Sequence, residues 1–209
     1  NLWTDSTLAF NADTGKSVWG FQHTPNDPYD YDSINENTFV DVNINGKFVR
    51  ATLHANRNGF AYALDRTNGK FIWGTQFVAE LNWTNGLDAN GRPASYNPKS
   101  DVHSYNPGTA AGRGGAKDGK GKLEGKLFPA HMGGKNWPPT AFSPHTGWYY
   151  IPAIEGCNRA FAEVTVPGKW KPRDLFLGGA PVTNLEHPDC GRITGSITAS
   201  NPSVGPTGD

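Results

Sequence analysis

A seven-residue pattern that recurs along the chain constrains its fold most strongly. The copies are Ala9–Gly15, Ala63–Gly69, Ala141–Gly147 and a degenerate Ala199–Gly205. In the first two copies a Lys follows the Gly, and Trp19 or Trp73 stands three residues further on, where the third copy has Ile151. Each copy predicts a strand, a tight turn closed by a Gly with positive φ, and a second strand whose Trp packs between neighbouring sheets.

Repeats of this kind, each a small antiparallel sheet, are typical of a β-propeller. The copies predict about four blades, and the truncated last copy favours a larger ring. A further hairpin is expected at Val42–Val49, where Asn45-Gly46 separates two alternating strands. No stretch has the apolar periodicity of a long amphipathic helix. We therefore expect an all-β fold, with residues 1–209 forming one partial propeller domain.

Residues 92–127 interrupt the pattern, since they are rich in Gly, Lys, Asn and Ser and show no alternation. They predict a long surface loop. Within them Gly114–Lys120 matches the start of a phosphate-binding loop, but Gly121 stands where Ser or Thr would hold magnesium. We reject a phosphate-binding loop on that ground.

Charge and composition exclude several partners. The 19 basic and 19 acidic residues give a net charge of +0 without a Lys/Arg stripe, which argues against nucleic-acid binding. No apolar run is long enough for a membrane span. The chain begins at Asn1 without a Met or a signal sequence, and we expect it to be an internal piece. Its two cysteines, Cys157 and Cys190, are compatible with a disulfide or with two buried thiols.

The densest polar cluster is His23–Asn37, with three Asp and one Glu between Asp27 and Glu36. If Tyr29–Ser33 is extended, Asp30 and Asp32 point to the same face, because side chains alternate along a strand. Two such carboxylates repel each other, and a hard cation relieves that repulsion. The alternative is a solvated acidic turn, and spacing alone leaves both interpretations open.

Three ordered motifs resemble the methanol and ethanol dehydrogenases that depend on pyrroloquinoline quinone (PQQ). The resemblance covers most of the chain apart from 92–127 and 158–190. Its motifs are Asn1–Trp19 with Phe21–Glu36, then Ala55–Gly69, then Gly133–Pro139 with Ser143–Gly147 and Tyr150–Ala153. It implies about half of an eight-bladed propeller with PQQ and a metal ion on its axis. The implied reaction oxidises a primary alcohol to an aldehyde in the periplasm.

The resemblance also implies a role for each site residue. Asp30 matches the catalytic aspartate, which takes the hydroxyl proton and binds the metal. Arg57 matches the arginine that hydrogen-bonds the quinone oxygens, and Asn136 and Trp137 match the pair that reaches the cofactor edge. Asp32 matches a metal ligand typical of the lanthanide-dependent branch, whereas the calcium branch has a small uncharged residue there. Taken singly, Arg57 is compatible with a surface strand and Trp137 with a core.

Other parts of that family's site would precede Asn1, so this segment alone is not expected to bind PQQ or to be active. The chain has no Cys-x-x-Cys-His motif, so we expect electrons to pass to a separate cytochrome c, and a homodimer is allowed. Relatives often pair the equivalent of Cys157 with a Cys just before the Gly-Gly segment, where this chain has Leu127–Pro129. Cys190 is therefore the expected replacement partner.

Two alternatives to an oxidoreductase differ in how well they fit the sequence. A non-enzymatic propeller that binds a partner remains the alternative, because one fold hosts many functions. A glycosidase fits poorly, because two carboxylates at i and i+2 on one strand do not straddle a scissile bond.

Overall fold

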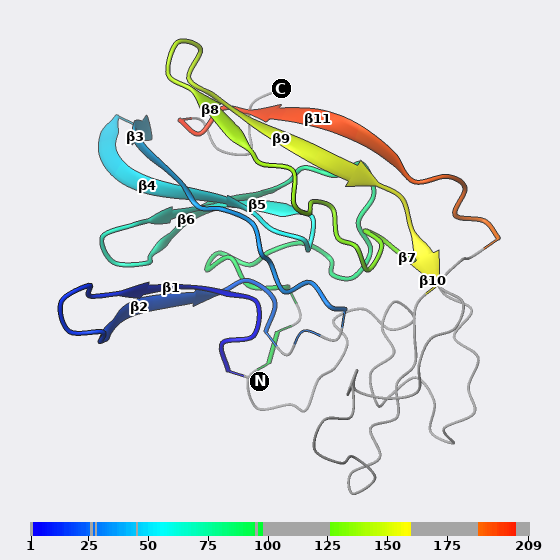
Figure 1. Ribbon diagram of the computed structural model, residues 1–209, viewed down its shortest axis with the longest axis horizontal. Helices are drawn as coiled ribbons and strands as arrows, with labels where there is room; N and C mark the ends of the chain where they lie inside the picture. The colour runs from blue at the N-terminus through cyan, green and yellow to red at the C-terminus, as the bar shows by residue number, and fades with distance from the viewer. Residues whose placement is uncertain are drawn as a thin grey trace, which may run out of the picture.

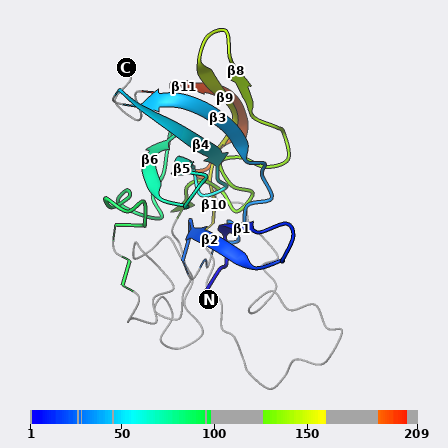
Figure 2. The same cartoon turned by 90° about the vertical axis from the view of Figure 1, so that its left-hand side faces the viewer.

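The computed structural model describes residues 2–25, 27, 29–44, 46–94, 96–97, 126–159 and 188–203. All regular elements in these residues are strands, which confirms the predicted all-β fold. Figure 1 shows three antiparallel sheets lying one above another in chain order, and Figure 2 shows them turned by 90°. No helix in the described part of the chain is long and apolar enough to cross a membrane.

The first sheet pairs β1 (Ser6–Phe10) with β2 (Ser17–Gln22). The second is a simple meander of β3 (Thr38–Ile44), β4 (Lys47–Ala55), β5 (Phe60–Asp65) and β6 (Phe71–Gln76). The third places β9 (Trp148–Glu155) between β8 (Ala141–Ser143) and β11 (Thr194–Ser200). A short pair, β7 (Lys126–Leu127) with β10 (Asn158–Arg159), joins two loops.

The repeated pattern forms tight turns, as predicted. Gly15, Gly69 and Gly147 all have a φ between +66° and +73°, and each donates its N–H to the carbonyl of the third residue of its copy. The side chain of that third residue accepts backbone N–H groups of its own turn in all four copies; these residues are Asn11, Asp65, Ser143 and Asn201. Short polar side chains at this position therefore stabilise the turn.

The two Trp residues of the pattern join neighbouring sheets, which confirms their expected packing. Trp19 lies opposite Ala9 in the β1–β2 pair and donates its indole N–H to the Arg66 carbonyl of the second sheet, 3.1 Å away. Trp73 lies opposite Ala63 and donates in the same way to the Pro202 carbonyl, also at 3.1 Å. Arg66 and Pro202 are both the fourth residue of their copy, so the contact repeats from sheet to sheet.

The copies of the pattern do not each mark a separate sheet. The third copy forms the β8–β9 turn and the fourth copy follows β11, so both belong to the third sheet. The residue opposite Ala141 is Tyr150, and Ile151 is a buried β9 residue that does not correspond to Trp19. The seven-residue pattern marks a kind of turn that occurs twice in one blade. Four copies therefore correspond to three sheets.

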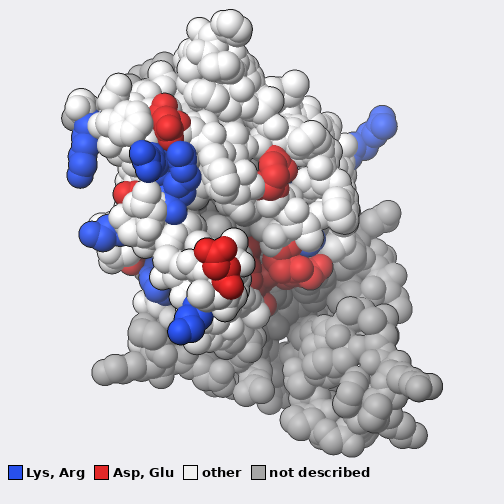
Figure 3. All heavy atoms as spheres, turned by 60° about the vertical axis from the view of Figure 1, so that its left-hand side comes forward, with Lys and Arg blue, Asp and Glu red and all other residues white. Residues whose placement is uncertain are grey.

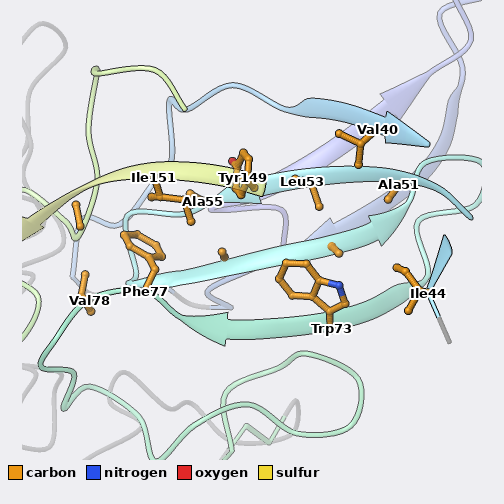
Figure 4. Packing of buried hydrophobic residues seen from close by; sticks show 13 residues of the cluster. Val40, Ile44, Ala51, Leu53, Ala55, Trp73, Phe77, Val78, Tyr149 and Ile151 are labelled. Atoms are coloured by element: carbon orange, nitrogen blue, oxygen red, sulfur yellow. The ribbon is translucent and has the colours of Figure 1, made fainter. Parts of the chain in front are cut away.

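The main core lies between the second and third sheets (Figure 4). Tyr149 and Ile151 of β9 point toward the small residues of β4 and β5, among them Ala51 and Ala55. These alanines allow the two sheets to approach closely. A second, aromatic cluster lies on the other side of β5 and includes Tyr29, Tyr31, Tyr62 and Trp83. Because β5 is buried on both sides, its position is fixed, and so is that of the turn that precedes it.

Two further predictions are confirmed. The Val42–Val49 hairpin forms, with Val42 opposite Val49 and a φ of +76° at Gly46. Cys157 and Cys190 form a disulfide with a Cα–Cα distance of 5.2 Å, which ties the end of β9 to the stretch before β11. Most of the predicted 92–127 loop lies outside the described residues, as does the phosphate-loop match at 114–120.

Candidate functional site

The segment from Tyr29 to Asp32 divides its side chains between the core and the surface. Tyr29 and Tyr31 are buried with their rings 5.2 Å apart, and the Tyr31 hydroxyl donates to the Pro129 carbonyl. The side chains of Asp30 and Asp32 are 69% and 65% exposed. Although Asp30 has a φ of +65° and the segment forms no strand, the two carboxylates therefore lie on the outer side together.

Asp27 fixes the backbone of this segment. One of its carboxylate oxygens accepts the N–H of Tyr29 at 2.8 Å, and the other accepts the N–H of Tyr31 at 2.6 Å. A carboxylate that holds two alternate N–H groups keeps the intervening residue in one conformation. Asp30 therefore stands on a constrained turn with its carboxylate directed outward.

Arg57 brings the two exposed carboxylates together. It lies in the turn between β4 and β5, is buried, and has Nη2 3.8 Å from Asp30 Oδ2 and Nη1 3.5 Å from Asp32 Oδ1. Its Nη1 also donates to the Asp32 carbonyl, and its Nη2 donates to the His131 carbonyl at 2.6 Å. The Nε atom is buried and has no hydrogen-bond partner among the described residues. One donor of the guanidinium thus remains for a ligand.

The surroundings change the acidity of Asp30. Although the Asp30 side chain is largely exposed, desolvation by the surrounding protein raises its pKa to about 6; the hydrogen-bonding contact with Asp32 acts in the same direction, and the positive charge of Arg57 lowers the pKa. A carboxyl group with this pKa can bind and release a proton near neutral pH, as a general base requires.

A tight turn at Ala130–Gly133 lies beside Arg57. The Gly133 N–H donates to the Ala130 carbonyl at 2.7 Å, and the Gly134 N–H donates to the Arg57 carbonyl at 2.8 Å. Gly133 has a φ of +83°, and a Cβ atom at this position would lie 2.6 Å from Arg57 Cβ. Only glycine therefore permits this close approach.

Asn136 is attached to the same turn. It is buried, its Nδ2 donates to the Met132 carbonyl at 2.9 Å, and its Oδ1 accepts the N–H of Trp137 at 3.0 Å. The Trp137 side chain is 79% exposed, which excludes a core role. Asp30, Asp32 and Arg57 are thus in direct contact and Asn136 is linked to them through the turn, whereas no direct contact joins Trp137 to the carboxylates or Arg57.

An ion pair between a buried lysine and a half-buried glutamate joins this loop to the acidic segment. Lys135 is fully buried, and its Nζ lies 3.4 Å from Glu36 Oε2 and 3.2 Å from the Asn136 carbonyl. Glu36 Oε1 also accepts the backbone N–H and the hydroxyl of Thr140. The pair joins residues 99 positions apart, so it holds Asn136 at a fixed distance from the end of the acidic segment.

These residues fit a quinone and a cation in part. The free Arg57 Nε suits a carbonyl oxygen, and the exposed Asp30–Asp32 pair suits a hard cation. Within the described residues no group of three or more His, Cys, Asp or Glu side chains is placed to hold a metal. This pair would therefore supply only part of a ligand shell.

On the face drawn in Figure 3, Lys and Arg lie mostly toward one margin and Asp and Glu nearer the middle.

Several residues that build the site were not recognised in the sequence. Asp27 was counted only as one acid of a cluster, although Asp followed by Pro28 is a signal for a turn. Lys135 carries no local signal, because its partner Glu36 is distant in the chain. The His131 carbonyl, being backbone, leaves no trace in the sequence.

Fold and site together define a partial β-propeller with a carboxylate–arginine cluster at one end of its sheets. Residues 1–82 match the PQQ family described as "Glucose/ethanol/alcohol dehydrogenase, beta-propeller domain". The quinoprotein alcohol dehydrogenase PedH of Pseudomonas putida is 43% identical over 155 residues, which are 74% of this chain and 24% of PedH.

Solved structures agree with this relationship. The quinohemoprotein alcohol dehydrogenase from Comamonas testosteroni has a TM-score of 0.69 at 30% identity, over 99% of this chain and 30% of that one. A europium-containing methanol dehydrogenase has a TM-score of 0.63 at 33% identity, over 78% and 26%. The chain is thus homologous to the PQQ-dependent quinoprotein alcohol dehydrogenases and covers part of their propeller, about a quarter to a third of their length.

Proposed function

We propose that this segment belongs to an enzyme that oxidises a primary alcohol to an aldehyde with PQQ and a metal ion. The observation that carries the proposal is the contact of Arg57 with both Asp30 and Asp32 on an exposed face. A buried guanidinium beside two solvent-facing carboxylates offers a hydrogen-bond donor, a proton acceptor and cation ligands within one small area. The homology to quinoprotein alcohol dehydrogenases supports the same conclusion.

In the proposed reaction Asp30 accepts the proton of the alcohol hydroxyl. When bound, PQQ supplies the acceptor for the hydride that leaves the alcohol carbon, and the metal ion supplies Lewis acidity. Because the pKa of Asp30 is raised to about 6, its carboxylate is largely ionised above that pH and can act as the base.

The other residues bind and orient. The Nε of Arg57 faces no described partner, so it can donate to a quinone oxygen. Asn136 and the exposed Trp137 ring would contact the cofactor edge. Because Asp27 and the stacked tyrosines hold the turn, Asp30 needs little reorganisation before it reacts.

We further propose that the metal is a lanthanide, with calcium as the alternative. Asp32 adds a second carboxylate beside Asp30, and the added negative charge favours a trivalent ion. The likeness to a europium-containing methanol dehydrogenase supports this choice. The remaining ligands would come from other parts of the enzyme.

The electron acceptor and the cellular compartment of the enzyme are part of the same proposal. We assign a cytochrome c as the electron acceptor, which the similarity to the 1-butanol dehydrogenase (cytochrome c) of Thauera butanivorans supports. A disulfide forms and persists in an oxidising compartment, which supports a periplasmic location. A homodimer is compatible with this assignment.

The metal assignment can be tested in the full-length protein that carries this segment. Metal-free protein is reconstituted with PQQ plus either lanthanum or calcium, and alcohol oxidation is followed with a dye acceptor. The parent should be active with lanthanum, and Asp32→Ala should lose that preference. Asp41→Ala is the matched control, because Asp41 is an exposed carboxylate paired with an arginine, Arg66, outside the site. Equal activity of the parent with both metals, or an unchanged preference in Asp32→Ala, would show that Asp32 does not select the ion.

A further inference from the structure

The backbone carbonyls of one turn orient two of the proposed cofactor-binding side chains. In the Ala130–Gly133 turn, the His131 carbonyl accepts from Arg57 Nη2 at 2.6 Å, and the Met132 carbonyl accepts from Asn136 Nδ2 at 2.9 Å. The two carbonyls are consecutive in the chain. A displacement of this turn would therefore move Arg57 and Asn136 together.

The turn is held from the other side by the chain that follows β9. The buried Asn158 accepts the His131 N–H on its Oδ1 at 2.6 Å, and the Gly156 carbonyl accepts the Ala130 N–H at 3.1 Å. Cys157, which is disulfide-bonded to Cys190, lies between these two residues in sequence. The bracing segment is thus itself fixed covalently.

We propose that Asn158 is a positioning residue for the cofactor site, which it sets through the Ala130–Gly133 turn. This inference rests on the proposed function, because it concerns how Arg57 and Asn136 are held ready for PQQ. The Oδ1 of Asn158 bonds the backbone of the turn. Its side chain fixes the His131 backbone, and the next peptide of that backbone carries the carbonyl that Arg57 needs.

The expected loss of PQQ affinity follows from the Arg57–His131 hydrogen bond, which becomes weaker when Asn158 is changed. The Arg57–His131 contact is a hydrogen bond from a charged donor, and such bonds contribute more to stability than neutral ones. A turn freed from Asn158 samples positions in which this bond is broken, and the guanidinium is then no longer preorganised for a quinone oxygen. We expect the affinity for PQQ to fall about 10-fold or more when Asn158 loses its acceptor oxygen.

The test is a titration of the full-length, metal-loaded protein with PQQ, in which quinone absorbance measures binding. Asn158→Leu keeps the approximate size of the side chain and removes the acceptor, so its dissociation constant should rise. Asn158→Asp keeps an acceptor and should restore most of the affinity. The matched control is Asn82→Leu, because Asn82 likewise bonds backbone groups, those of Lys126 and Phe128, on the stretch just before the turn. That control should bind PQQ as the parent does.

A second variant changes the last residue of the Ala130–Gly133 turn. Gly133→Ala would place a Cβ atom 2.6 Å from Arg57 Cβ without touching Asn158, and it should weaken PQQ binding in the same way. It decides the question if Asn158→Leu does not fold, as judged by circular dichroism. Folded Asn158→Leu or Gly133→Ala with the parent's affinity would overturn the inference. A parent that binds no PQQ would instead overturn the proposed function.

Discussion

The ion pair between Lys135 and Glu36 leads to the most quantitative prediction. In Glu36→Gln the amide keeps the shape of the side chain and the Thr140 bonds, but the buried Lys135 ammonium loses its counter-charge. At the Nζ–Oε2 distance of 3.4 Å, Coulomb's law with an effective dielectric of about 20 gives ~5 kcal/mol. Glu36 is 38% exposed, so water screens part of this, and we expect the free energy of unfolding to fall by about 2–3 kcal/mol.

The reciprocal change should have a smaller effect. Lys135→Met removes the buried charge together with its need for a partner, and it fills most of the volume, so we expect a loss of about 1 kcal/mol. In the double variant, Glu36→Gln should then cost almost nothing further. The expected coupling between the two sites is therefore about 2–3 kcal/mol.

The assay is urea unfolding of the full-length protein and its variants, purified without PQQ and metal. Glu155→Gln is the matched control, because Glu155 also accepts a backbone N–H and a hydroxyl, from Ala79 and Ser196, but pairs with no lysine in the described residues. It should lose under about 1 kcal/mol. Purely additive effects of Glu36→Gln and Lys135→Met would refute the reasoning, because they would mean that the two charges do not interact.

Three shorter predictions concern pH, the disulfide and the contact between sheets. Burial raises the pKa of Asp5 from 3.8 to about 7, so the folded protein retains a proton that the unfolded chain releases. The contribution of Asp5 to stability should therefore fall as the pH rises from about 4 to about 7, by up to ~4 kcal/mol, and the stability difference between the parent and Asp5→Asn in urea unfolding should change with pH accordingly. Mass spectrometry of unreduced peptides should find Cys157 joined to Cys190, and two free thiols would contradict the structure. Trp73→Phe removes the indole bond to the Pro202 carbonyl and should lower stability by about 1–2 kcal/mol, with a near-neutral result excluding this contact as a stabilising link.

The sequence predicted local structure well because the relevant signals are local. Gly15 and Gly69 mark turns that require positive φ, and Asn45-Gly46 marks a hairpin. The alternation of tyrosine with aspartate placed Asp30 and Asp32 on one side, although the backbone is a constrained turn and no strand. In each case neighbouring residues decide the conformation.

The arrangement of residues that are distant in the chain was harder to predict from the sequence. The seven-residue pattern does not distinguish the β5–β6 turn from the β8–β9 turn, so the sequence did not reveal that two of its four copies lie on one sheet. The Trp opposite the first Ala would have separated the two kinds of turn, since it is present at Trp19 and Trp73 and missing from the third copy. The pairing of Lys135 with Glu36 depends on sheet packing, which no local pattern encodes.

The central claim is that Asp30 is the base of a PQQ-dependent alcohol oxidation, and one comparison tests it most directly. Full-length parent and Asp30→Asn are reconstituted with PQQ and lanthanum, and dye-linked alcohol oxidation is measured once quinone absorbance shows equal loading. The account predicts that the parent is active and that Asp30→Asn loses at least about 100-fold in rate with its fold intact, because a general base contributes roughly 10²–10⁴-fold. An equally loaded Asp30→Asn protein with activity within a few-fold of the parent would contradict it.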